Sequence, residues 1–112
     1  MRIISQDGTI DVPYEYVALV VSGGKYKDAE YACIYCHNIS APHGTRLAEY
    51  STKEKAIKAM EMLREQHEKV AFLKTIINTE KGASFVRGLS ENDFDKMTRN
   101  YFQFPKDDEV EA

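Results

Sequence analysis

The sequence predicts an α+β domain in which a small antiparallel sheet of four to five strands packs against one long amphipathic helix and a shorter C-terminal helix, both on one face of the sheet. Two observations lead to this prediction. Short β-forming runs separated by turn residues occupy the first part of the chain, and helical periodicity begins only after them. Strands that precede helices, rather than alternate with them, are typical of this fold class.

Length and composition indicate one globular domain. The chain has 112 residues, which is enough for one domain and too few for two ordinary ones. Hydrophobic residues make up 43% and charged residues 29%, which is a globular balance and not that of a disordered chain. We expect a single domain over residues 1–105, followed by a solvated acidic tail over residues 106–112, KDDEVEA.

The first strand-forming runs are MRIIS and IDVPYEYVALVVS. Asp7-Gly8 between them favours a hairpin, because glycine accepts the positive φ that a tight turn needs. Pro13 lacks an amide hydrogen, so its strand lies at a sheet edge, at a bulge or before the ladder begins. The valine-rich run 16–22 predicts a strand buried on both faces.

The next segments alternate between turns and strands. GGKYKDAE after residue 22 is typical of a polar turn, and YACIYCHN, residues 31–38, predicts a strand. ISAPHGT, residues 39–45, contains proline and glycine and predicts a loop, and residues 46–51 predict a short strand. ASFVRG, residues 83–88, is a further candidate strand.

The clearest element is a helix over residues 51–74. Ser51 or Thr52 can cap its start, and Glu54 stands where a capping box with Ser51 requires it. Apolar residues recur at helical spacing and predict a face packed on the sheet. This face consists of Ala56, Met60, Leu63, His67 and Val70, with Ile57 beside it.

A second helix is predicted in LSENDFDKMTRNYF, residues 89–102. Ser90 is a favourable N-cap, Asp93 complements the positive helix start, and Leu89 can pack on Phe94. Pro105 ends regular structure after it. Phe102 and Phe104 are expected to close the core from the C-terminal side.

Cys33-Ile34-Tyr35-Cys36-His37 has the form C-x-x-C-H, which raises three possible chemistries. Cys33, Cys36, His37 and His43 supply enough ligands for zinc. The same spacing is used for covalent c-type haem, and C-x-x-C is used for thiol redox chemistry. A haem site needs export, and a redox pair needs a helix start after the motif, where this sequence predicts strands.

Strand geometry favours a structural role for the two thiols. In a strand, Cys33 and Cys36 point to opposite sides of the sheet, because alternate residues share a face. We therefore expect small, buried, reduced side chains, with no bound metal and no cofactor. No phosphate-binding loop and no nucleophile–base pattern is present, so we expect no catalytic residues and no enzymatic activity.

Tyrosines and the acidic C-terminal segment are the candidate protein-binding residues. Seven tyrosines and five phenylalanines occur without tryptophan, and tyrosine is enriched at interfaces. Strands also select aromatic residues for packing, which is the alternative explanation. The candidates are Tyr26, Tyr31, Tyr35, Asp107, Asp108 and Glu109.

The charge distribution limits the partners. Net charge is −3, and the basic residues are mixed with acidic ones, so direct nucleic-acid binding is not favoured. No apolar run approaches the ~20 residues that span a bilayer, and the start MRIISQDGT does not resemble a signal peptide. We expect a cytoplasmic protein without membrane contact.

Three stretches resemble a family of short, uncharacterised proteins encoded by phages, prophages and integrative elements of Gram-positive bacteria. They are MRIISQDGTIDVPYE at 1–15, YSTKEKAIKAMEMLR at 50–64 and FQFPKDDEVE at 102–111. They cover about a third of the chain, and stretches 16–49 and 65–101, with both cysteines and all three histidines, carry no such resemblance. The resemblance implies a mobile-element setting in the host cytoplasm and no particular activity.

The expected function is therefore that of a non-enzymatic protein-binding accessory protein, with inhibition of a host defence system such as a CRISPR effector as its specific form. The partner is expected to be a host or phage protein. A homodimer through an exposed strand edge is a further expectation. Two alternatives stay open: a small zinc- or thiol-dependent protein using the C-x-x-C-H stretch, and a nucleic-acid-binding accessory protein.

Overall fold

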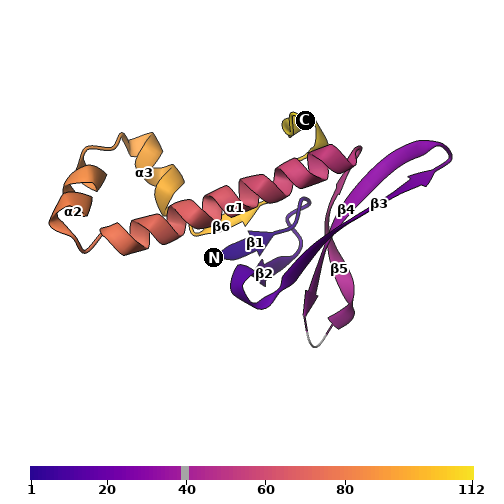
Figure 1. Ribbon diagram of the computed structural model, residues 1–112, viewed down its shortest axis with the longest axis horizontal. Coiled ribbons are helices and arrows are strands. Elements are labelled where there is room, and N and C mark those ends of the chain that lie inside the picture. The colour runs from indigo at the N-terminus through magenta and orange to yellow at the C-terminus, as the bar shows by residue number, and fades with distance from the viewer. Residues whose placement is uncertain (39–40) are drawn as a thin grey trace.

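The computed structural model describes residues 1–38 and 41–112, without the side chains of residues 41–43. The α+β class is confirmed (Figure 1). The strands are divided between two three-stranded sheets, so the expectation of one antiparallel sheet of four to five strands was wrong. In chain order the strands and α-helices are β1 (Arg2–Ile4), β2 (Asp11–Pro13), β3 (Ala18–Tyr26), β4 (Ala29–Asn38), β5 (Ala41–Tyr50), α1 (Lys53–Ile76), α2 (Glu80–Arg87), α3 (Glu91–Thr98) and β6 (Tyr101–Gln103).

The first sheet has the order β2-β1-β6. β1 and β2 are antiparallel, and Pro13 lies on the edge strand, as its missing amide hydrogen requires. β6 runs parallel to β1, with Ile3 opposite Phe102. The sequence did not predict β6, because three residues are too few to show a β period.

The connection between β1 and β2 depends on Asp7 and Gly8. Gly8 has a φ of +78°, which glycine adopts without a steric penalty. The Asp7 carboxylate accepts hydrogen bonds from the Thr9 hydroxyl and the Ser5 hydroxyl, both at 2.7 Å, and from the Thr9 amide at 3.0 Å. These hydrogen bonds lower the pKa of Asp7 to about 2. The expected hairpin is confirmed, with a wider turn than the sequence suggested.

The second sheet has the order β3-β4-β5 and is fully antiparallel. β3 extends to Tyr26, and the tight turn that follows uses Lys27 and Asp28, both at positive φ. A Lys-Asp pair is an unusual choice for such a turn, so the sequence suggested only a polar connection there. β5 likewise begins earlier than expected, at Ala41, within a segment expected to be a loop.

α1 confirms the long helix. The Thr52 hydroxyl caps it by accepting a hydrogen bond from the Lys55 amide at 3.1 Å, so the capping box with Ser51 does not form. Its buried residues are Ala56, Ala59, Leu63, Val70 and Leu73. Ile57, expected beside this face, is 42% exposed, because it lies about 100° around the helix from Ala56. His67 stacks on Tyr14 with ring centroids 4.2 Å apart.

α2 and α3 form a helical arm with the C-terminal half of α1, beyond the end of the sheets (Figure 1). Residues 83–88 were expected as a strand, but Glu80 to Arg87 are helical, with the Thr79 hydroxyl accepting from the Gly82 amide at 2.9 Å. α3 is capped by Ser90 as predicted and ends at Thr98, earlier than predicted. Its contacts are mainly with α1, so it does not pack on a sheet face.

One core joins both sheets to the first half of α1. It contains Ile3 and Phe104 from the first sheet region, Ile34 from β4, and Leu63 from α1. Tyr50 at the end of β5 is 1% exposed and donates from its hydroxyl to the carbonyl of Pro105 at 2.7 Å. Burial raises the pKa of this hydroxyl. Phe104 closes the core from the C-terminal side, as expected.

The acidic segment packs on the domain. Val110 is 4% exposed and belongs to the core. The Asp107 carboxylate accepts from the Ser51 amide at 2.7 Å and the Ser51 hydroxyl at 2.9 Å, and it pairs with the Lys55 ammonium at 3.3 Å. Asp107 thus lies against the start of α1, where a negative charge is favoured. The expectation of a fully solvated tail was wrong, because Val110 and Asp107 anchor the segment.

The molecule is elongated. Its extents are 57 × 33 × 20 Å, and its radius of gyration is 16.4 Å, against about 13 Å for a compact domain of this length. The β3–β4 hairpin projects at one end and the helical arm at the other (Figure 1). An elongated shape leaves more side chains outside the core than a sphere does.

Asp107→Asn should lower the free energy of unfolding by about 1 kcal/mol at neutral pH, because it weakens the hydrogen bonds from Ser51 and removes the charge that pairs with Lys55. The Ser51 amide, the Ser51 hydroxyl and Lys55 hold the pKa of Asp107 below its ordinary value of 3.8. The stabilisation is therefore complete above that value and is lost as pH falls below it. Urea unfolding at pH 7 and pH 3 measures both effects, and the exposed neighbour Asp108→Asn is the control, with a change near zero.

Candidate protein-binding surface

The side of the second sheet that faces away from the core carries the candidate surface. Cross-strand neighbours share a face, so the strand pairing determines its members. We call this side the outer face. It consists of Ala18, Val20, Ser22, Gly24 and Tyr26 of β3, Ala29, Tyr31, Cys33, Tyr35 and His37 of β4, and Arg46 and Glu49 of β5.

The opposite side of the same sheet is buried. Ala32, Ile34, Cys36, Ala48 and Tyr50 alternate with the outer-face residues and belong to the core. α1 covers only this side, so β3 is not buried on both faces as the valine-rich run 16–22 suggested. Val20 is 46% exposed and Tyr16, just before β3, is 79% exposed.

Three tyrosines predicted as binding residues come together on the outer face. Tyr26 is 67% exposed and Tyr31 is 38% exposed, and Tyr35 is opposite Val20. Tyr31 lies across Gly24 on the neighbouring strand, where a Cβ would be 2.8 Å from the tyrosine hydroxyl oxygen. Glycine at this position therefore allows the Tyr31 ring to lie flat on the sheet.

Polar groups border these aromatic side chains. Arg46 is opposite Tyr35 and forms a loose ion pair with Glu49, with 3.8 Å between the nitrogen and oxygen atoms. The pKa of the Tyr35 hydroxyl is raised by the charge of the Cys33 thiol and by its hydrogen bond with that thiol, whereas Arg46 acts in the opposite direction. The outer face thus combines apolar area, hydroxyl groups and one guanidinium, a composition typical of protein interfaces.

The two cysteines lie on opposite faces of the sheet. Cys33 is opposite Ser22 and Glu49 on the outer face, whereas Cys36 is opposite Leu19 and belongs to the core. Both are buried free thiols. Their side chains diverge, so this strand does not present them as a pair to one metal ion.

The candidate histidine ligands do not complete a metal site in the described part of the chain. His37 packs against Gly44, where a Cβ would be 2.5 Å from the imidazole. The side chain of His43 lies outside the described residues. Among the side chains that the structure describes, no group of three histidine, cysteine or acidic residues is placed to hold a metal ion.

The three acidic candidates do not join the tyrosines. Asp107 is engaged by Ser51 and Lys55 at the start of α1, and its contacts are within the fold. The Glu109 carboxylate accepts from the Lys106 amide at 2.9 Å, which stabilises the short turn over Asp107–Glu109. Asp108 is exposed. Glu109 is exposed as well, so within this group only Asp107 is partly buried.

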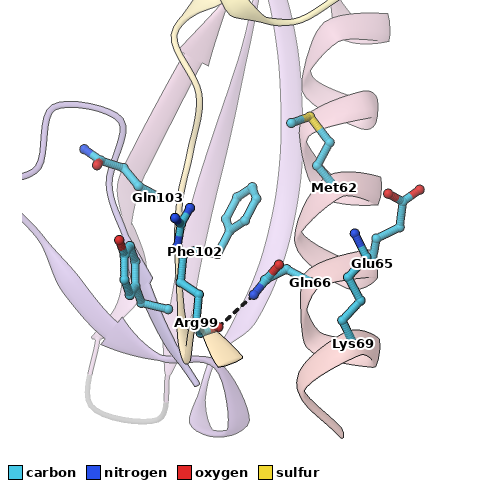
Figure 2. Close-up of a pocket in the computed structure, with 8 residues that line it drawn as sticks. Met62, Glu65, Gln66, Lys69, Arg99, Phe102 and Gln103 are labelled. Atoms are coloured by element: carbon cyan, nitrogen blue, oxygen red, sulfur yellow. Dashed lines mark hydrogen bonds between the residues drawn. The ribbon is translucent and has the colours of Figure 1, made fainter. Parts of the chain in front are cut away.

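A groove of about 370 Å³ lies between α1 and residues 99–103, which include β6 (Figure 2). Figure 2 shows Gln66 reaching from α1 across the groove, where its amide donates to the carbonyl of Arg99 at 2.7 Å. The same amide also donates to the carbonyl of Lys96 at 3.3 Å. The remaining lining residues are Met62, Glu65, Lys69, Tyr101, Phe102 and Gln103. The groove contains no nucleophile beside a base, and its central contact ties the end of α3 to α1.

The helical arm exposes a second set of apolar side chains. Phe72 is 52% exposed, Phe85 48% and Phe94 40%, and Ile77 is 48% exposed. The outer face is the better defined surface, because strand register fixes which side chains are neighbours.

Comparison with protein-family models, with curated proteins and with solved structures found no match for the chain. Among the described helices, none is long and apolar enough to cross a membrane.

Gly24→Ala should displace the Tyr31 ring from the outer face, because its Cβ would come within 3.0 Å of the ring. Gly23→Ala is the matched control, since a Cβ there would meet only the Tyr31 carbonyl at an ordinary 3.5 Å. The aromatic NMR shifts of Tyr31 report the displacement. Equal spectra for the two variants would show that the ring does not lie on Gly24.

Zinc added to the reduced protein should not bind through Cys33 and Cys36 together, because the two thiols lie on opposite faces of β4. Native mass spectrometry with one equivalent of zinc tests this directly. A one-zinc mass increment that disappears in both Cys33→Ser and Cys36→Ser would contradict the observed strand.

Proposed function

We propose that this chain is a non-enzymatic protein-binding accessory protein of a phage or mobile element, and that it contacts a host or phage protein through the outer face. The single observation that carries the proposal is the uncovered aromatic side of the β3-β4-β5 sheet. Apolar side chains on a sheet are normally covered by a second layer, and here α1 covers only the other side. A partner that supplies the missing layer would bury Val20, Tyr31 and Tyr35.

The side chains of the outer face suit a hot spot. Tyrosine offers a large rigid contact area at a low cost in conformational entropy, and arginine is enriched with it at interfaces. Tyr31 packs over Gly24, which restrains its ring in the free protein. Binding therefore costs less side-chain conformational entropy. Arg46 and Glu49 would form the polar rim that excludes water from such a site.

The mobile-element setting rests on the resemblance of three stretches, and these stretches lie together in space. Residues 1–15 form β1 and β2, 50–64 form the start of α1, and 102–111 include the end of β6 and the anchored C-terminal segment (Figure 1). The stretches without resemblance, 16–49 and 65–101, form the outer face and most of the helical arm. We infer a shared scaffold whose two projecting parts determine the partner.

The specific form of the proposal is inhibition of a host defence system. Small cytoplasmic proteins act on such systems by occupying a functional surface of a larger protein. An apolar tyrosine face suits occlusion of a protein surface better than nucleic-acid mimicry, since a mimic needs a dense acidic surface and the net charge here is only −3.

A bait experiment with matched variants tests the proposal. The tagged chain is used to capture proteins from a Gram-positive host lysate, and the captured protein is then purified for titration. Tyr31→Ala combined with Tyr35→Ala should raise the dissociation constant at least roughly tenfold, because two hot-spot side chains are lost. Phe85→Ala, equally apolar and exposed on the helical arm, is the control and should leave the dissociation constant unchanged.

Two results would contradict this function. Failure to retain any protein in stoichiometric amount would remove the binding role. A partner that binds the double tyrosine variant as tightly as the wild type, but is lost on Phe85→Ala, would move the interface to the helical arm.

A further inference from the structure

The two edges of the second sheet differ in how their backbone groups are satisfied. At the β5 edge, the Gln6 amide donates to the carbonyl of Leu47 at 2.8 Å. The Gln6 side chain accepts from the Glu49 amide at 3.0 Å and donates to the Glu49 carbonyl at 3.1 Å. Two irregularities also interrupt the ladder between β4 and β5. The turn of the first sheet therefore satisfies the β5 edge at Leu47 and Glu49.

The β3 edge has no comparable cover. β3 pairs with β4 over nine consecutive residues, Ala18 to Tyr26, in an uninterrupted register. Among the residues that the structure describes, no strand lies along its other side. Natural sheet edges are usually protected by proline, bulges or charges. β3 has no proline and a single charge, Lys25, close to the hairpin tip.

The turn geometry identifies which backbone groups point outward. Lys27 and Asp28 form a two-residue turn with both φ values positive, so Tyr26 and Ala29 are the hydrogen-bonded pair that closes the hairpin. Hydrogen-bonded pairs alternate along an antiparallel ladder. The residues that direct N–H and C=O away from β4 are therefore Leu19, Val21, Gly23 and Lys25.

We propose that β3 pairs antiparallel with β3 of a second copy of this chain, about a twofold axis at Val21. This pairing joins the two three-stranded sheets into one continuous sheet. It places Val21 opposite its own copy, Leu19 opposite Gly23 and Val20 opposite Ser22. The outward N–H and C=O groups of Leu19, Val21 and Gly23 then find partners in the second copy.

The distribution of side chains favours a second copy as the occupant of this edge. Tyr26, the last residue of β3, is 67% exposed, and Tyr16, which is 79% exposed, ends the short 3-10 helix Tyr14–Tyr16 before β3. The twofold axis directs Tyr26 of each copy past the start of the other's β3, toward the short helix that carries Tyr16. From Ala18 to Gly24, β3 has only uncharged side chains, so no charge is buried at the axis. Lys25 comes opposite Val17 and far from its own copy, so no like charges meet.

The dimer has a consequence for the outer face. A twofold axis within a sheet is perpendicular to it, so both outer faces lie on the same side and become continuous. Tyr31 and Tyr35 of both copies then belong to one surface. The inference is nevertheless independent of the proposed partner, because it depends on the edge of β3 and not on the face.

Sedimentation equilibrium of the whole chain over a concentration series tests the proposal. We expect a reversible dimer of two 12.8 kDa chains. Gly23→Pro should raise the dissociation constant at least roughly tenfold, because it removes an outward N–H from each copy and places a ring against the other strand. Gly23→Ala is the matched control and keeps the dimer, since its Cβ has ordinary contacts only.

Charge pairs test the register. Val20→Lys with Ser22→Lys places like charges opposite one another across the axis and should weaken the dimer. Val20→Lys with Ser22→Glu places opposite charges there and should restore it. Both positions are exposed on the outer face, so the hairpin tolerates both double variants, which circular dichroism verifies.

Three outcomes would overturn the inference: a chain that stays monomeric at millimolar concentration, a dimer that persists in Gly23→Pro, and equal dissociation constants for the two charge variants. None of them bears on capture of a host protein through Tyr31 and Tyr35. A monomer that still captures its partner would refute the dimer and leave the proposed function standing.

Discussion

The structure depends on one helix, α1, that packs against both small sheets. α1 is 24 residues long, about 36 Å, and only its first half packs where the sheets meet. Ala56 and Ala59, fully buried small residues, let the helix backbone approach the strands, and Leu63 fills the space beyond them. Because α1 packs in the core shared by the two sheets, it covers one side of the β3-β4-β5 sheet and leaves the other side exposed. The exposed tyrosines, the elongated shape and the projecting helical arm all follow from this arrangement.

The C-terminal segment adds to the core that α1 forms with the sheets, and it also contacts the start of α1. β6 places Phe104 in the core, and the chain then crosses the start of α1, where Asp107 contacts Ser51 and Lys55. The Tyr50 hydroxyl bonds to the Pro105 carbonyl on the way. The C-terminal part of the chain thus contacts both β1, through β6, and the start of α1, through Asp107. Long-range contacts of this kind make the scaffold cooperative. They also explain why the acidic segment packs on the domain, although its composition predicts a solvated tail.

The sequence predicted the features that depend on a few neighbouring residues, but it did not predict how the strands divide between two sheets. The α+β class, the span of α1, the cap at Ser90 and the divergence of Cys33 and Cys36 all follow from periodicity or capping within a few residues. β6 is too short to show a period, and α2 has β-forming residues in a helix that Thr79 initiates. The face of tyrosines could be foreseen only in part. Alternation put Tyr31 and Tyr35 together, but nothing in the run 16–22 showed that a covering layer would be missing.

The open edge of β3 results from how the two sheets meet. The turn after β1 reaches the second sheet on the β5 side, where Gln6 satisfies Leu47 and Glu49. The same turn cannot also cover the outer edge of β3, because β5 and β4 lie between the turn and β3. Gln6 additionally donates to the Pro105 carbonyl at 3.0 Å, so its side chain is fixed on the β5 side by the C-terminal segment. The scaffold that orders one edge therefore leaves the other edge, with its outward amides at Val21 and Gly23, to be satisfied by water or by a second chain.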